Sequence, residues 1–376
     1  MSFEEEDELN SESETYNCTF YELTPKKLKK ICESLSNKNN FKNIIFKKND
    51  FSSKSCIHIS NLIENNKFIK TLEIGFNDIG EKGIKHISEA LKTNQTLKTI
   101  KLYETNFKDK GLEYLSKSIE INNTLIEIDI TENYFTSKGI EKFHESLQKN
   151  TTLQILILSS NKIGELEMNI ISKILECNPS IKRLDLSKNL IRDSDLQKLS
   201  ESLLKNFTLT NLNLSDNEKL TSKGLFYLQE SFDENPTLKE LFYHKRISFD
   251  DSTKEFFKRN SNLINLEIGF NECLDEFLIR FFDIIKENFV LKSLDVTISN
   301  FLYCKSSTID YLIVCLKSNP TLRIFKINSI ERKYTEEINK RLGENLRIWQ
   351  QKNHFSMMTK LRYEKKISNI FFCFNE

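Results

Sequence analysis

An asparagine recurs along this chain at a spacing of 28 residues, and that period constrains the fold more than any other feature. One gap is doubled, because Thr105 occupies the expected position. A large apolar residue stands eight, five and three residues before each position, as Leu153, Leu156 and Leu158 do before Asn161. A period of this length indicates a solenoid of stacked structural units. The recurring residues, which we call the slot asparagines, are Asn49, Asn77, Asn133, Asn161, Asn189 and Asn217.

Each unit divides into a strand and a helix. The stretch before the slot alternates apolar and polar residues, which predicts a short strand, and the following half has the apolar spacing of a helix, as in residues 139–147. Parallel strands pack about 4.8 Å apart, whereas neighbouring helix axes need about 8–10 Å. The stack must therefore curve, with strands on its concave face and helices on its convex face. The slot asparagines are predicted to bind backbone groups where the strand turns away.

The segment from Ile181 to Ile191, IKRLDLSKNLI, matches the motif L-x-x-L-x-L-x-x-N-x-L with isoleucine at both ends. The chain thereby resembles the leucine-rich repeat family, and within it the ribonuclease-inhibitor-like class with 28-residue repeats. The resemblance implies an α/β solenoid, a right-handed β-α horseshoe with parallel strands on the concave face and helices on the convex face, built from about 11 to 12 repeats.

Two further sets of residues follow the same period. The triplets N-x-T that begin at Asn94, Asn122, Asn150 and Asn206 look like glycosylation acceptors, but they recur at one repeat junction, and the repeat explains them better. Four glycines share one position in the first helical turn, which predicts close approach of the neighbouring helix: Gly83, Gly111, Gly139 and Gly224. Regularity fades after Asn217, where one residue is inserted and a shortened repeat follows, so residues 243–260 are a rival candidate for a binding site.

The ends differ from the repeats in composition. Residues 1–14 carry seven acidic and no basic residues, and we expect them to be disordered. Residues 15–350 are predicted to form a single solenoid domain, with a first capping helix that starts near Pro25 and a last helix that holds Trp349. Residues 351–376 form a tail. Its apolar tip, residues 370–374, either folds back on the cap or is a short motif for a partner or a membrane surface.

Charge and cysteine usage exclude several classes of protein. The 55 Lys and Arg residues nearly balance the 54 Asp and Glu residues, which argues against a general nucleic-acid binder. The chain opens with acidic residues instead of a secretory signal, and no apolar stretch approaches the roughly 18 residues of a membrane span. The eight cysteines form no C-x-x-C pair, so we expect reduced thiols in a cytoplasmic protein.

Chemistry-bearing motifs are missing from the sequence. It contains no phosphate-binding glycine loop, no H-E-x-x-H helix and no G-x-S-x-G elbow. The paired carboxylates Asp250 and Asp251 fall in a loop and are expected to be solvated surface. We therefore predict no catalytic residue, no cofactor and no metal site, and we do not expect an enzyme.

The concave face is the predicted binding surface. Residues six, four and two positions before each slot alternate with core residues and should point into the concavity. Three of them, Ile155, Ile157 and Phe242, are apolar where exposure is expected, a feature that marks an interaction site unless the exposure is accidental. The partner-binding residues are predicted to be Lys101, Tyr103, Asp129, Ile155, Ile157, Arg183, Asp185 and Phe242.

Two functions remain compatible with the sequence. The first is a non-enzymatic scaffold or adaptor that binds a protein partner, of unknown identity, through this concave face. The second follows from a resemblance in repeat and length to activators of the small GTPase Ran, whose horseshoe stimulates the GTPase's own chemistry. That family has an acidic C-terminal tail, whereas residues 331–376 here hold ten Lys and Arg against six Asp and Glu.

Overall fold

The computed structural model describes residues 14–20, 22–271, 275–298, 305–327, 336–345 and 347. In this part of the chain, strands and helices alternate from end to end. The strands are β1 (Thr15–Asn17), β2 (Asn43–Ile45), β3 (Thr71–Glu73), β4 (Thr99–Lys101), β5 (Glu127–Asp129), β6 (Ile155–Ile157), β7 (Arg183–Asp185), β8 (Asn211–Asn213), β9 (Glu240–Ile247), β10 (Asn265–Phe270), β11 (Ser293–Ile298) and β12 (Ile324–Ile327). The helices are α1 (Pro25–Ser36), α2 (Ser55–Asn65), α3 (Gly80–Thr93), α4 (Lys108–Ile119), α5 (Ser137–Leu147), α6 (Glu165–Cys177), α7 (Asp193–Leu203), α8 (Ser222–Glu234), α9 (Asp251–Arg259), α10 (Asp275–Glu287) and α11 (Ser306–Ser318).

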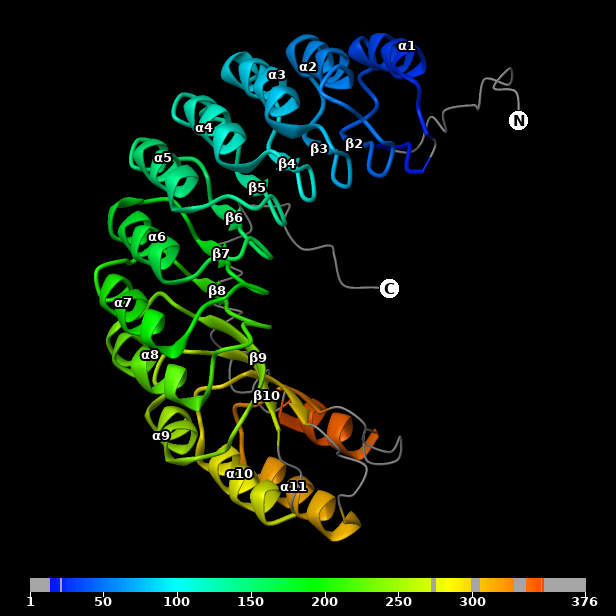
Figure 1. Cartoon of the computed structure of the whole chain (residues 1–376). Helices are drawn as coiled ribbons and strands as arrows, with labels where there is room; N and C mark the ends of the chain where they lie inside the picture. Colours follow the sequence, from blue (N-terminus) through cyan, green and yellow to red (C-terminus); the bar gives the residue numbers. More distant parts are fainter. Residues whose placement is uncertain are drawn as a thin grey trace, which may run out of the picture.

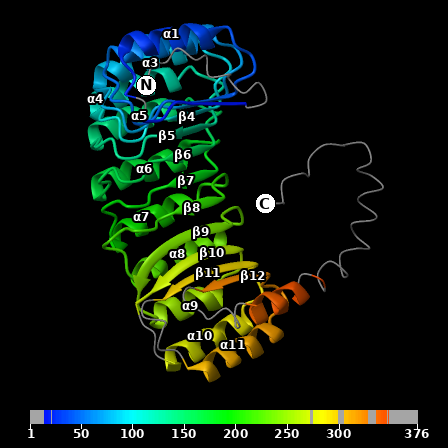
Figure 2. The same ribbon diagram turned by 90° about the vertical axis from the view of Figure 1, so that its right-hand side faces the viewer.

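The described strands form one 12-stranded parallel sheet in which strand order follows sequence order from β1 to β12. The strands line the inner side of an arc and the helices line its outer side (Figure 1). Viewed after a quarter turn, the strands lie one above the other along the arc (Figure 2). The predicted α/β horseshoe, concave at the sheet and convex at the helices, is confirmed.

The apolar frame of each repeat fills the space between sheet and helices. In the fifth unit, Leu125, Ile128 and Ile130 point inward from the strand and are at most 2% exposed. Ile140 and Phe143 of α5 meet them and are fully buried. Burial of side chains of this size contributes about 1.5–3 kcal/mol each, so every unit is stabilised by its contacts with the next.

The slot asparagines lie buried behind the strands and tie successive repeats together. The Nδ2 group of Asn161 donates to the carbonyls of Leu158 and Ser159 in its own repeat, at 3.1 and 3.0 Å, and to that of Ile130 in the preceding one, at 3.0 Å. Its Oδ1 accepts from the backbone N–H groups of Asn133, at 2.7 Å, and Tyr134, at 3.1 Å. One side chain therefore binds five backbone groups at the turn and joins the repeat to the preceding one.

These turns also explain why the first strands are so short. The residue before the slot has a positive φ in eight successive units, from Phe20 to Asp216, and this left-handed conformation ends a strand. Strands β2 to β8 accordingly have three residues each. After Asp216 no described residue has a positive φ, and β9, β10 and β11 run for eight, six and six residues. The register between β9 and β10 shifts at Ile268 and Gly269, at the shortened repeat.

A second set of asparagines, the junction asparagines, follows the helices. Asn150 donates from Nδ2 to the carbonyls of Ile119, at 2.8 Å, and Asn122, at 3.0 Å. Its Oδ1 accepts from the N–H groups of Thr152 and Leu153, at 3.1 and 2.9 Å. In the other junction asparagines, Nδ2 likewise donates to a carbonyl of the preceding repeat, and Oδ1 accepts from the N–H groups two and three residues later. These residues are Asn66, Asn94, Asn122, Asn178, Asn206, Asn235, Asn288 and Asn319. Buried amides used in this way explain the recurring N-x-T triplets.

The two ends of the solenoid are covered by helices. At the first end, α1 begins at Pro25 and its N-cap is Thr24, whose hydroxyl accepts from the N–H of Lys27. At the other end, the helical residues 336–345 bury Ile338 and Leu342. The predicted disordered segment lies almost wholly outside the described residues, as do Trp349 and the tail 351–376 with its apolar tip.

Candidate functional site

The predicted binding residues share the inner face of one continuous sheet. Strand register aligns Lys101 with Asp129, Asp129 with Ile157, and Ile157 with Asp185. The same row continues through Asn213 to Phe242. A neighbouring row places Ile155 beside Arg183. Because the units are parallel and in register, side chains that are 28 residues apart in sequence become direct neighbours on this surface.

Tyr103 is held in place on the face by contacts with three neighbouring residues. Its hydroxyl donates to Glu73 of the preceding strand, and its ring meets Phe76 edge to face with centroids 5.2 Å apart. Gly75 leaves room for the ring, since a Cβ at that position would lie 2.2 Å from Tyr103 Cε2. Burial and the bond to Glu73 raise the pKa of the Tyr103 hydroxyl, so it stays a neutral donor. Sequence reasoning found Tyr103 but missed this support, although Gly75 was a visible break in the strand pattern.

The apolar residues on the face are less exposed than predicted. Ile155, Ile157 and Phe242 are only partly exposed. Ile157 lies between Asp129 and Asp185 in the register, so this apolar side chain has a carboxylate on each side. This arrangement of an apolar centre with a polar surround is typical of a protein interface.

The structure corrects the prediction for Asp185. This carboxylate was expected to be an exposed charged neighbour, but it is only 9% exposed. Its Oδ1 accepts from the N–H and hydroxyl of Ser187, at 2.9 and 2.6 Å, and its Oδ2 accepts from Asn213 Nδ2 at 2.8 Å. Asp129 is held in the same way by Thr131, and burial raises its pKa. The carboxylates of Asp129 and Asp185 are therefore bonded to neighbouring residues, whereas the side chain of Arg183 is exposed, as predicted.

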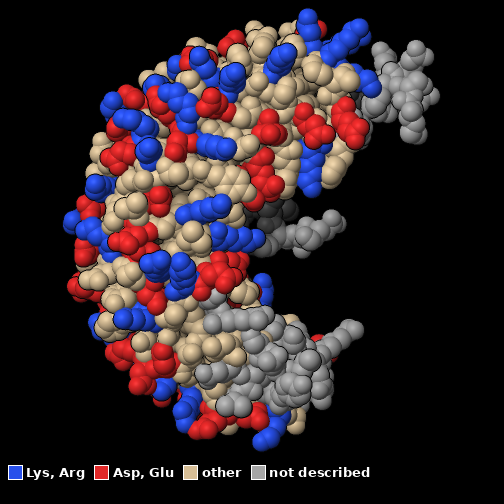
Figure 3. Space-filling model, viewed as in Figure 1, with Lys and Arg blue, Asp and Glu red and all other residues tan. Residues whose placement is uncertain are grey.

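The inner face is acidic. On the inward-facing rows from β3 to β11, the described cations are Lys101, Arg183 and, by strand register, Arg246. The carboxylates on the same rows are Glu73, Glu127, Asp129, Asp185, Glu240, Glu267 and Asp295. Lys47 and Lys326 of the flanking units pair with Glu73 and Asp295. The rest of the visible surface mixes both signs (Figure 3). A surface with this charge attracts basic protein surfaces and repels phosphates.

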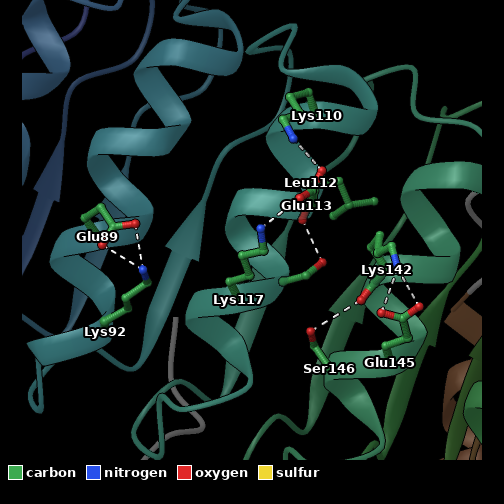
Figure 4. A network of polar contacts seen from close by, with 10 residues as sticks. Glu89, Lys92, Lys110, Leu112, Glu113, Lys117, Lys142, Glu145 and Ser146 are labelled. Atoms are coloured by element: carbon green, nitrogen blue, oxygen red, sulfur yellow. Dashed lines mark hydrogen bonds and ion pairs between the residues drawn. The ribbon is translucent and has the colours of Figure 1, made fainter.

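The convex face differs, because many of its charges are paired within a helix, as in α4, α5 and α7. Figure 4 shows Lys142 of α5 bonded to Glu145, at 2.7 Å, and Glu113 of α4 bonded to both Lys110 and Lys117. The hydrogen bonds from Lys110 and Lys117 lower the pKa of Glu113 to about 2. Such pairs neutralise one another on an exposed helix face and leave little unpaired charge for a partner.

The described residues offer little for catalysis or metal binding. Five cysteines are described and all are free thiols. Burial raises the pKa of Cys32 and Cys56 to about 12, so neither is a thiolate nucleophile. Within the described ranges no three His, Cys, Asp or Glu side chains come together as a metal site would require. None of the helices there combines the length and the apolar character needed to cross a membrane.

Comparison with known proteins agrees with this architecture. The family model for the leucine-rich repeat matches residues 65–88, 149–165, 177–200 and 205–228. These four stretches therefore contain leucine-rich repeats, in agreement with the parallel sheet and the motif of residues 181–191. Among curated proteins none matches the sequence.

Solved structures with some likeness include actin-binding site 2 of leiomodin-1, with 17% identity over 58% of this chain and 95% of that chain and a TM-score of 0.29. The tropomodulin C-terminal domain of Caenorhabditis elegans has 12% identity over 37% of this chain and 85% of that chain, with a TM-score of 0.33. The yeast complex of Rad7 and Elc1 contains a chain with 16% identity over 85% of this chain and 81% of that chain, with a TM-score of 0.45.

Proposed function

We propose that this leucine-rich repeat protein is a non-enzymatic scaffold or adaptor that binds a protein partner through its concave face between β4 and β9. The partner surface is basic, because the carboxylates of this face outnumber its cations. We assign the protein to the cytoplasm, since free thiols such as Cys56 suit a reducing compartment. The 28-residue period supports the ribonuclease-inhibitor-like class of repeat.

The observation that carries the proposal is the fixed position of Tyr103. An aromatic side chain held by Gly75, Phe76 and Glu73 loses little conformational freedom when a partner covers it. Ring and hydroxyl together provide apolar area and a polar contact, which is why tyrosine is enriched among the residues that dominate binding energy. Ile157, between two carboxylates, supplies the second apolar contact on the same rigid sheet.

Replacement of both contacts tests the proposal. With a partner obtained by proximity labelling, we expect Tyr103→Ala combined with Ile157→Asp to weaken binding by at least about 2 kcal/mol in titration calorimetry. The pair Lys142→Glu and Lys198→Glu on α5 and α7 should leave the affinity nearly unchanged, because both lysines lie on the convex face in pairs with glutamates. Circular dichroism should show that all variants remain folded. The opposite ranking would move the site to the convex face.

The alternative function, activation of a small GTPase of the Ran type, predicts a different result. We expect no acceleration of GTP hydrolysis when the purified chain is mixed with Ran bound to GTP. Arginine fingers and similar electrostatic help are worth about 10³–10⁵ in rate in GTPase systems. Phosphate release in a single-turnover assay would therefore show true activation clearly, and an increase of about a hundredfold would favour the alternative over the scaffold.

A further inference from the structure

A groove of about 620 Å³ crosses the convex side at helices α7, α8 and α9. It lies where the sequence shortens a repeat, since α9 has nine residues and α8 has 13. The four missing residues amount to about one helical turn. The groove therefore borders α9, the shortest of the helices α1 to α11.

Two adjacent aromatic side chains, Phe226 and Tyr227, line this groove. Phe226 is 59% exposed, and its ring meets that of Tyr227 at 6.0 Å between centroids. In α5, which begins with the same Thr-Ser-Lys-Gly sequence, the corresponding positions hold Glu141 and Lys142. The repeat itself therefore does not require an aromatic pair here, and Phe226 and Tyr227 together add apolar area to the lining of the groove.

The rim of the groove is acidic, and part of its charge is unpaired. Glu201, Glu230, Glu234 and Glu255 line it, with Arg259 as the one cation among its lining residues. Arg259 is already engaged by Asp233 at 2.6 Å. Glu230 and Glu234 form no ion pair with any described residue, in contrast to the paired glutamates of α4 and α5.

We propose that this groove binds a basic amphipathic segment of a protein partner, at a second site separate from the concave face. Lysine or arginine side chains of the segment pair with Glu230 and Glu234, and its apolar side chains pack on Phe226 and Tyr227. Charge complementarity selects this occupant, because an acidic or phosphorylated segment would meet four glutamates and a single cation, Arg259, which is already paired with an aspartate.

The test uses the full chain and a fluorescein-labelled amphipathic helical peptide composed of leucine and arginine. Fluorescence anisotropy should show saturable binding that weakens as salt is added. Phe226→Ser and Glu230→Lys should each weaken it by at least about tenfold. A peptide of the same pattern with glutamate in place of arginine should not bind.

Matched variants separate this site from general attraction. Phe68→Ser removes another exposed phenylalanine, and Glu145→Lys makes the same charge change at the corresponding position of α5. Both should keep the affinity within about twofold of the unmodified chain. Equal losses in Glu145→Lys and Glu230→Lys, a loss in Tyr103→Ala instead, or failure of the peptide to saturate would overturn the proposal. The last two outcomes do not decide the concave-face proposal, which is tested separately with the partner found by proximity labelling.

Discussion

Asn161→Leu is expected to lower the free energy of unfolding by about 2–3 kcal/mol. The change removes five hydrogen bonds, three donated by Nδ2 and two accepted by Oδ1. The N–H groups of Asn133 and Tyr134 lose their partner, whereas each of the three carbonyls keeps a second donor. Each buried polar group left unpaired costs about 1–3 kcal/mol, and partial rearrangement recovers some of the sum. Urea unfolding followed by circular dichroism measures the effect.

Asn39→Leu is the control for this prediction. Asn39 lies outside the repeating frame and is exposed, so its replacement should change the free energy of unfolding by less than about 0.5 kcal/mol. Losses of the same size in both variants would show that the asparagine at the slot has no special role in joining the repeats.

Gly111→Ala is expected to destabilise the chain by about 2 kcal/mol, the typical cost of overpacking. A Cβ at this position of α4 would lie 2.4 Å from Phe107 Cβ and 2.7 Å from Ile84 Cγ2 of α3. The two helices would have to separate, and because each repeat contacts only its neighbours, the disturbance falls on one interface. The same unfolding titration detects it.

Gly343→Ala should have the opposite sign. This glycine lies in the helical residues 336–345, and a Cβ there would meet nothing within 4 Å. Alanine is favoured over glycine in a helix by up to about 1 kcal/mol, so the variant should be unchanged or more stable. A gain of stability in Gly111→Ala would contradict the close approach of α3 and α4.

Much of the fold follows from the sequence because the pattern repeats. An apolar frame in successive 28-residue registers leaves one way to bury its residues, and the curvature follows from the different spacing of strands and helices. The longer strands from β9 onward were not predicted. There the residues before the turn no longer adopt positive φ, and sequence alone gives little sign of this, because the earlier positions are held by such ordinary residues as Lys48, Glu104 and Ser160.

The binding surface was less predictable than the fold. Alternation along a strand identifies which residues face the concavity, but exposure there depends on neighbours 28 residues away. Asp185 is buried because Ser187 and Asn213 both bond to it. The junction asparagines could have been assigned their role from the recurrence of N-x-T-L alone, since buried amides at a fixed repeat position usually satisfy backbone groups.

Hydroxyl-radical footprinting of the chain with and without its partner tests the concave-face proposal most directly. The partner should protect Tyr103 and Phe242 from oxidation and leave Tyr114, a partly exposed tyrosine of α4 on the convex face, unchanged. Mass spectrometry of the peptides measures each rate separately. Protection of Tyr114 with unchanged oxidation of Tyr103 and Phe242 would contradict the proposal that this horseshoe binds its partner through the sheet.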